Sequence, residues 1–356
     1  MIAYLLFFCV AGLPALFHMR RRHAVLWAMA WLVFVLFIGL RHEVGGDWQG
    51  YLMITERIFH LGLQDALRDQ EPLFSLITWI SAKSGFGVYG ANLFGSLIFC
   101  TGLFAYCARL PNRWLALAAA TPFLVVVAVM SANRQGMAIG VLLFVMSRWK
   151  QWGLSWRAMG ILLAGSFHTS ALLLLVLVVL DLKIHRVAKV LATIAMVVIA
   201  LWLVSRSEAA WYRYTTIYKD QSAGAYSSGA LFHLLLNLVP AVLMLFMHKT
   251  WRRLPVDWGL LRPLCWMAVG LLFLTPFFTV AVGRMSLYLF PVSISFIATF
   301  PSLVQRAEGR ALLRLLAVTA LGGVLAVWLA FANTAFTYRP YQNALFVPAW
   351  DLALPK

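Results

Sequence analysis

The sequence predicts an all-α fold, that of a polytopic integral membrane protein with about ten transmembrane helices and two shorter, re-entrant or half-span helices. Composition is the first reason, because 63% of the residues are hydrophobic and only 12% are charged, too few for a water-soluble surface. The mean hydropathy of +0.85 and many apolar runs of about 18–20 residues are the second. Third, the basic residues behind the net charge of +17 form short clusters between these runs, which is the positive-inside pattern. We therefore expect a single transmembrane domain over 1–356 and no nucleic-acid partner.

The first two spans bring an acidic loop to the outer face. Residues 2–17 are apolar and a basic cluster follows at 19–23, whereas a cleaved signal has its basic residues first. We therefore predict an uncleaved anchor with its N-terminus outside, and a second span at about 24–40 that returns to the outside. The loop 41–71 follows and holds six of the twelve acidic residues. A carboxylate at a helix centre costs about 2.5–3.5 kcal/mol in the bilayer, so this loop lies outside it.

The segment 73–82 is apolar but too short to cross a hydrocarbon core, which needs about 20 residues. We expect a re-entrant or half-buried helix here. Pro72 suits its first turn, and the carboxylate of Glu71 suits its positive N-terminal end.

The remaining spans alternate between the two faces. They are expected at about 88–107, 114–130, 136–147, 190–204, 230–247, 263–281, 285–303 and 312–332. On this topology the tip 131–136, the tyrosine-rich loop 205–229, the tip Gly283–Arg284 and the C-terminal tail face outward.

Residues 158–180 allow two interpretations. One straight helix would place the following basic residues outside, against the charge rule. Two half-helices broken at 165–168 would restore the rule, and a break at membrane depth is tolerated where it lines a cavity or is buried in protein.

Several polar side chains gather on the outer side under this one topology. They are Arg41, Asp47, Glu71, Arg134, Gln135, His168 and Arg284. Arginine binds phosphate oxygens in a bidentate manner, a carboxylate can take a proton from a sugar hydroxyl, and loop Trp and Tyr side chains can stack on sugars. This set suits a saccharide linked to a polyprenyl diphosphate.

Simpler interpretations stay open for the same residues. Arg41 can be a snorkelling residue at a helix end, and His168 can form only a hydrogen bond to a neighbouring helix. Most charges of loop 41–71 can belong to the solvated face of an interfacial helix. The four cysteines lie in apolar segments, and we expect no disulfide, metal or cofactor.

Four short motifs resemble the EpsG-like family of polysaccharide polymerases, a branch of the Wzy-type O-antigen and exopolysaccharide polymerases. These are Arg41-x3-Gly45-x-Asp47-x3-Tyr51, Glu71-Pro72, Asn133-Arg134-Gln135 and Phe167-His168-Thr169-Ser170-Ala171, with a looser match at Gly283-Arg284-Met285. The resemblance covers roughly residues 25–300, in order.

The resemblance implies a metal-independent glycosyltransferase with a GT-C-like fold, which moves a growing chain from undecaprenyl diphosphate onto one lipid-linked repeat unit at the periplasmic face. Asp47, Glu71 and His168 would be the catalytic residues, with Asp47 or Glu71 as the base and His168 positioning the acceptor. The residues expected to bind substrate are Arg41, Tyr51, Arg134, Gln135 and Arg284, with Arg134 and Arg284 on the donor diphosphate.

Two other functions fit the same class of sequence. One is an O-antigen ligase or another lipid-linked glycosyltransferase, and the other is a flippase or transporter of lipid-linked sugars. The six acids in one loop favour the polymerase over the transporter, which would show two pseudo-symmetric halves. We expect a bacterial inner-membrane protein with both termini in the periplasm, which works beside membrane lipid, a chain-length regulator and a flippase.

Overall fold

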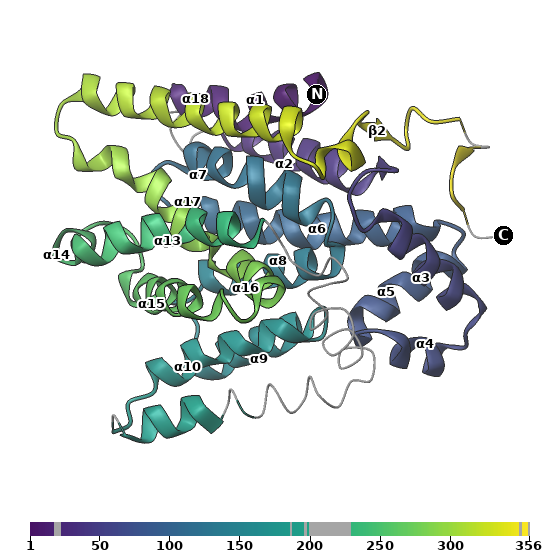
Figure 1. Cartoon of the computed structure of the whole chain (residues 1–356), viewed down its shortest axis with the longest axis horizontal. Helices are drawn as coiled ribbons and strands as arrows, with labels where there is room; N and C mark the ends of the chain where they lie inside the picture. The colour runs from purple at the N-terminus through teal and green to yellow at the C-terminus, as the bar shows by residue number, and fades with distance from the viewer. Residues whose placement is uncertain (18–22, 186, 196–197, 199–228, 349–350, 355–356) are drawn as a thin grey trace. The chain divides into compact units, whose positions relative to one another are not determined.

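The computed structural model describes residues 1–17, 23–185, 187–195, 198, 229–348 and 351–354 (Figure 1). These residues are mostly helical. Three of the described helical stretches are long and apolar enough to cross a membrane, Gly87–Cys107, Thr279–Leu303 and Ala307–Phe331, and shorter apolar helices accompany them. The protein is therefore an all-α membrane protein, while the count of about ten crossings stays a prediction.

The chain divides into two compact units, which we describe separately. The first unit contains Met1–Ser147, Ser166–His168 and Ile297–Lys356, and the second contains Arg148–Gly165 and Thr169–Phe296. The single transmembrane domain expected from the sequence stays a prediction.

The first unit is built around α6. Its helices are α1 (Ile2–Leu16), α2 (Ala24–Gly39), α3 (Trp48–His60), α4 (Leu63–Asp69), α5 (Pro72–Lys83), α6 (Gly87–Cys107), α7 (Arg113–Ala120), the π-helix η1 (Thr121–Val129), α8 (Asn133–Ser147), the 3-10 helices η6 (Phe300–Leu303) and η7 (Ala335–Tyr338), and α18 (Ala307–Phe331). Helix α6 packs against α2, α5 and α8, and α1 packs against α7 and α18 (Figure 1).

Glycine allows α6 and α8 to cross with their backbones in contact. A Cβ atom on Gly102 of α6 would overlap the backbone of Gly140 in α8, and a Cβ on Gly140 would overlap the backbone at Phe99. Small residues at such crossings let membrane helices approach closely, because van der Waals packing is what holds them together in lipid. This crossing fixes the position of α8, whose first turn carries Arg134.

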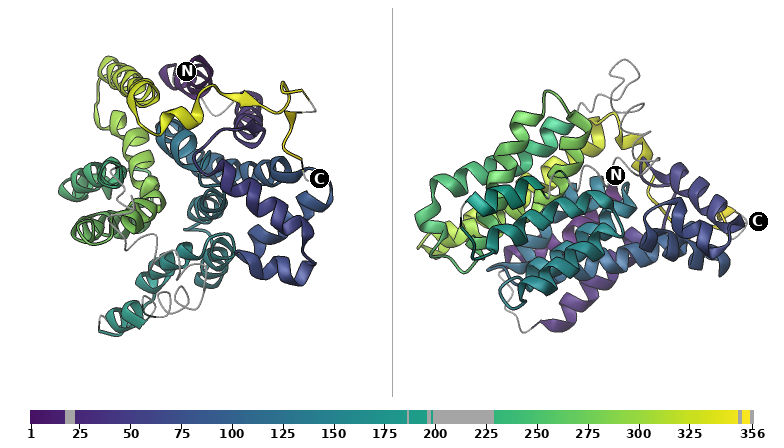
Figure 2. Two further views of the ribbon diagram at one scale, coloured as in Figure 1. Left: turned by 45° about the vertical axis from the view of Figure 1, so that its right-hand side comes forward. Right: turned by 90° about the horizontal axis from the view of Figure 1, so that it is seen from below.

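The acidic loop 41–71 folds into two short helices that lie beside α5. Helix α5 contacts both α3 and α4, and Figures 1 and 2 show the three helices as one group. Before them, the short strand β1 (Arg41–His42) pairs antiparallel with β2 (Gln342–Asn343). The C-terminal tail is therefore paired with the start of loop 41–71.

The second unit contains shorter and more broken helices. They are α9 (Leu154–Gly165), the 3-10 helices η2 (Thr169–Leu174) and η5 (Leu287–Leu289), α10 (Leu175–Asp181), α13 (Ala230–Phe246), α14 (His248–Trp251), α15 (Trp258–Leu274) and α16 (Thr279–Ser286), followed by α17 (Phe290–Thr299), which continues into the first unit. Helix α13 packs against α15 and α16, and α9 packs against η2 and α10.

Several sequence-based expectations can be compared with these elements. Helix α5 has 12 residues, which confirms a short helix at 73–82, and its place in the bilayer stays a prediction. The break at 165–168 is also confirmed, because α9 ends at Gly165 and η2 begins at Thr169. Most of the span at 190–204 and nearly all of loop 205–229 lie outside the described residues.

The prediction of an outer tip at Gly283–Arg284 is wrong. Both residues lie inside α16, and the turn falls earlier, at 275–278, between α15 and α16. Pro276 explains the position of the turn, because proline lacks the backbone N–H that a continuing helix needs.

Candidate active site

The start of α5 positions Glu71. Glu71 has extended backbone angles and caps the helix, Pro72 follows at its first turn, and the carbonyl of Glu71 accepts a hydrogen bond from the amide of Ser75 at 2.9 Å. The amide of Leu73 donates to the carbonyl of Ser166 at 3.1 Å. The helix break at 165–168 therefore lies against the first turn of α5.

The two carboxylate oxygens of Glu71 contact two different basic side chains. Oε2 lies 2.9 Å from Nη1 of Arg134, and Oε1 lies 3.0 Å from Nδ1 of His168. These side chains keep between 12% and 14% of their surface exposed, so they are largely desolvated but reachable. We call Glu71, Arg134 and His168 the carboxylate cluster.

The partners of Glu71 control its protonation. Burial by itself would raise the pKa of the carboxyl, but the hydrogen bond and charge of His168 and the charge of Arg134 outweigh it and lower the pKa to about 2. Glu71 is therefore ionised at neutral pH. An ionised carboxylate only accepts hydrogen bonds, so the contact at Nδ1 of His168 is one in which the imidazole donates.

Arg134 is held in the first turn of α8 by three further contacts. Its backbone amide donates to the hydroxyl of Tyr51 at 3.2 Å, Nη1 donates to the side-chain oxygen of Gln70, and the guanidinium lies over the ring of Phe74, 5.6 Å from its centre. A guanidinium carries five N–H donors, and Gln70 and Glu71 both accept from Nη1. Arg134 therefore has donor capacity beyond these two bonds.

The spacing of the first motif has a structural reason. Gly45 has a φ of +106°, and a Cβ on it would overlap the carbonyl oxygen of Met130 in the turn before α8. Two residues later, the backbone amide of Asp47 donates to Oγ of Ser131 in that same turn, at 3.2 Å. The motif thus docks the start of α3 against the start of α8.

Asp47 and Tyr51 take different places one helical turn apart. The side chain of Asp47 is exposed at the N-terminus of α3, whereas Tyr51 is 7% exposed and contacts the backbone of Arg134. Burial raises the pKa of the Tyr51 hydroxyl, and the negative charge of Asp47 raises it further while Arg134 opposes the rise. Asp47 is therefore close enough to Tyr51 to affect the pKa of its hydroxyl.

Arg41 is buried and contacts none of the three cluster side chains by a hydrogen bond or ion pair described for it. It is 1% exposed, its Nη1 donates to the carbonyl of Ile38 at 2.6 Å, and its Nη2 donates to Oδ1 of Asn92 at 3.1 Å. The same Asn92 oxygen accepts from Nδ2 of Asn133 at 2.9 Å. Arg41 is thus linked through α6 to the residue that precedes Arg134.

The other two expected substrate-binding residues are Gln135 and Arg284. Gln135 is buried at 2% exposure in α8. Arg284 is half-buried in α16 of the second unit, whereas the carboxylate cluster belongs to the first.

Three residues that support the site were not expected from the sequence. Gln70 contacts Arg134, Asn92 accepts from both Arg41 and Asn133, and Ser166 accepts from the amide of Leu73. A signal existed for Asn92, because an amide inside the apolar run 88–107 needs a hydrogen-bond partner at membrane depth. In the part of the chain that the structure describes, no three His, Cys, Asp or Glu side chains converge as metal ligands.

One comparison with known proteins gives a match. A family model described as the EpsG family matches residues 24–343, which is most of the chain. No curated protein and no solved structure matches this sequence.

Proposed function

Because this chain belongs to the EpsG family of polysaccharide polymerases, we propose that it joins lipid-linked oligosaccharide repeat units into a longer polymer. The donor is a growing chain on undecaprenyl diphosphate, and the acceptor is a single lipid-linked repeat unit. We propose that the reaction takes place at the periplasmic face of the bacterial inner membrane, the side on which the positive-inside rule predicts loop 41–71.

One observation carries this proposal, namely that Glu71 joins a guanidinium to an imidazole at 2.9 and 3.0 Å. Glycosyl transfer from a diphosphate needs a group that accepts the proton of a sugar hydroxyl and a cation beside the departing diphosphate. In the cluster, a proton-accepting imidazole and a cationic guanidinium both contact the carboxylate of Glu71, and all three side chains are largely buried.

We assign the proton transfer to His168. In its neutral form, the imidazole that donates from Nδ1 to ionised Glu71 has Nε2 as its basic nitrogen. In the proposed step the acceptor hydroxyl oxygen forms a bond to the anomeric carbon of the donor, the bond from that carbon to the phosphate oxygen breaks, and the hydroxyl proton passes to Nε2. Glu71 stabilises the imidazolium that forms, as a carboxylate does in other histidine pairs.

Arg134 then stabilises the negative charge that develops on the leaving undecaprenyl diphosphate. A guanidinium suits this role because its planar donors match phosphate oxygens. The exposed carboxylate of Asp47, one turn from Tyr51, is proposed to bind sugar hydroxyls near the cluster. Arg41 is proposed to act as a positioning residue through Asn92 and Asn133.

The test is the length distribution of surface polysaccharide in cells that lack the protein. These cells are complemented with wild type, Glu71→Gln, Arg134→Ala or His168→Gln, and the polymer is separated on a gel. Glu56→Gln is the matched control, because Glu56 is an exposed glutamate of α3 in the same loop. With purified protein and lipid-linked repeat units, we expect each cluster variant to lower the rate by at least about 100-fold, the scale of general acid–base catalysis.

The outcomes separate the competing functions. Loss of the ladder while single repeat units still reach the surface supports polymerisation. Retention of lipid-linked repeat units inside the cell would instead favour the flippase, and loss of transfer to the final acceptor with a normal ladder would favour the ligase. Unchanged polymer in all three cluster variants would overturn the assignment of the site.

A further inference from the structure

A cavity away from the carboxylate cluster's residues lies within the first unit, formed by the residues before α7, the end of α17 with η6, and the start of α18. It has a volume of about 410 Å³ and is lined by Asn112, Pro301, Ser302, Arg310 and Arg314, among others. This volume falls within the roughly 300–1,000 Å³ typical of small-molecule pockets. None of its lining residues belongs to the carboxylate cluster.

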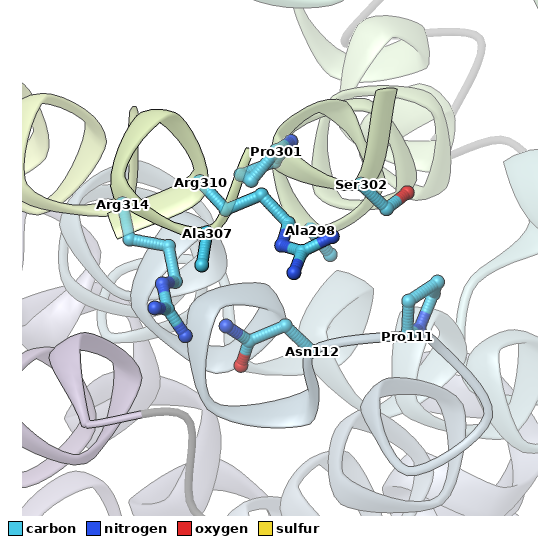
Figure 3. Close-up of a pocket in the computed structure, with 8 residues that line it drawn as sticks. All are labelled: Pro111, Asn112, Ala298, Pro301, Ser302, Ala307, Arg310 and Arg314. Carbon is cyan, nitrogen blue, oxygen red and sulfur yellow. The ribbon is translucent and has the colours of Figure 1, made fainter. Parts of the chain in front are cut away.

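The cavity presents hydrogen-bond donors. Arg310 and Arg314 are one helical turn apart on α18, and Figure 3 shows both side chains extending toward Asn112. The side-chain oxygen of Asn112 caps α7 by accepting from the amide of Leu115 at 3.0 Å. Because the oxygen is used in that bond, the amide nitrogen Nδ2 is the group of Asn112 that can donate to a ligand in the cavity.

Two of these donors are buried without a hydrogen-bond partner among the described residues, Nδ2 of Asn112 and Nε of Arg314. A buried donor left unsatisfied is unfavourable, so native structures rarely keep one without a reason. No carboxylate lines the cavity. The cavity lining therefore offers no negatively charged group to the two guanidinium side chains.

The chemistry of the cavity selects an anion. Arginine side chains prefer planar or tetrahedral oxyanions that accept several hydrogen bonds. The cavity also lies at the N-terminal ends of two helices, since Asn112 is the N-cap of α7 and Ala307 is the first residue of α18. Helix N-termini favour negative charge and are frequent phosphate sites.

We propose that this cavity binds a phosphate-bearing anion. The outer surface of α18 favours a phospholipid headgroup as its source, because the large apolar side chains of Leu312, Leu315 and Leu316 are each about half exposed beside Arg310 and Arg314. In a membrane protein such a surface faces acyl chains, so a lipid can insert its headgroup there. A soluble phosphate compound is the other source of the same chemistry.

The experiment uses the full chain, purified in a neutral detergent, and the double variant Arg310→Gln/Arg314→Gln. The control is Arg253→Gln/Arg306→Gln, which removes the same charge from two exposed arginines that do not line the cavity. Binding of phosphatidylglycerol is measured by native mass spectrometry against phosphatidylcholine. Inorganic phosphate and pyrophosphate are titrated separately, with thermal unfolding as the readout.

We expect the cavity variant to bind phosphatidylglycerol at least tenfold more weakly than wild type, and the control to bind like wild type. A soluble compound would be the source if phosphate or pyrophosphate stabilised wild type but not the cavity variant, and if wild type showed no preference for phosphatidylglycerol. That result would still support the anion site. Equal losses in both double variants, or no binding of either probe by wild type, would overturn the proposal. Arg310→Lys/Arg314→Lys keeps the charge and is a second control, for the loss of charge in the cavity variant. Unfolding temperatures measured without added lipid identify any variant that folds poorly.

Discussion

Glu71 joins Arg134 and His168 through its two carboxylate oxygens, and the free energy of this arrangement depends on pH. In the folded protein the pKa of Glu71 is lowered from 4.5 to about 2, because His168 and Arg134 outweigh the effect of burial. A carboxylate with a lowered folded-state pKa stabilises the fold above its unfolded pKa. That contribution, worth roughly 3 kcal/mol for a difference of this size, is lost as the pH falls from about 4.5 to about 2.

Glu71→Gln is expected to reveal this dependence. The variant should unfold at a lower temperature than wild type near pH 7, and the difference between the two should shrink as the pH falls through the window from about 4.5 to about 2. Thermal unfolding in detergent across this pH range measures it, with Glu56→Gln as the control in the same loop. A difference that stays the same at about pH 7 and about pH 2.5 would show that the charge of Glu71 is not the cause.

The sequence identified the residues of the carboxylate cluster but not the way they are joined. Glu71, Arg134 and His168 were each expected on the outer side, and their contacts at 2.9 and 3.0 Å span more than 60 positions of the chain. Arg41 shows the opposite limit. Its charge suggested an exposed ligand, but its burial depends on Asn92 in α6 and on the distant tail strand β2, which no local pattern contains.

At the scale of elements, the crossing of α6 and α8 determines where Arg134 lies. Gly102→Ala is expected to destabilise the protein by about 1–3 kcal/mol, because the new methyl group would overlap the backbone of Gly140 in a tightly packed crossing. Gly323→Ala in α18 is the matched control, since a Cβ there meets nothing within 4 Å. Replacing an exposed helix glycine by alanine is favourable by up to about 1 kcal/mol.

Thermal unfolding and the rate of polymerisation should separate these two variants. We expect Gly102→Ala to lower both, and Gly323→Ala to leave the rate unchanged and the unfolding temperature equal or higher. Equal stability of the two variants would mean that the α6–α8 crossing tolerates wider separation than its backbone contact indicates.

Element boundaries followed from the sequence where a single residue type decides them. Pro72 marks the first turn of α5, and the short apolar segment after it gives a helix of 12 residues. The Gly283–Arg284 pair, in contrast, suggested a turn, although glycine is tolerated inside packed helices and both residues lie within α16. Pro276 was the better indicator, because it ends α15 by removing a backbone donor.

At the scale of the whole molecule, the net charge of +17 is explained by orientation, since most basic clusters lie between spans on the side predicted to face the cytoplasm. The proposed function depends on this orientation, because loop 41–71 carries Glu71. We expect residue 62, in this loop, to face the periplasm, and residue 153, in the basic segment between α8 and α9, to face the cytoplasm.

Cysteine labelling tests this orientation directly. Gly62 and Gly153 both have open space around them, so Gly62→Cys and Gly153→Cys should fold normally and expose a thiol. The native cysteines Cys100, Cys107 and Cys265 are buried and Cys9 is half-buried, and wild type measures their background. In spheroplasts, a membrane-impermeant maleimide should label Gly62→Cys at once and Gly153→Cys only after the membrane is opened. The reverse order would place the carboxylate cluster on the cytoplasmic face, where a polymerase acting on exported repeat units could not use it.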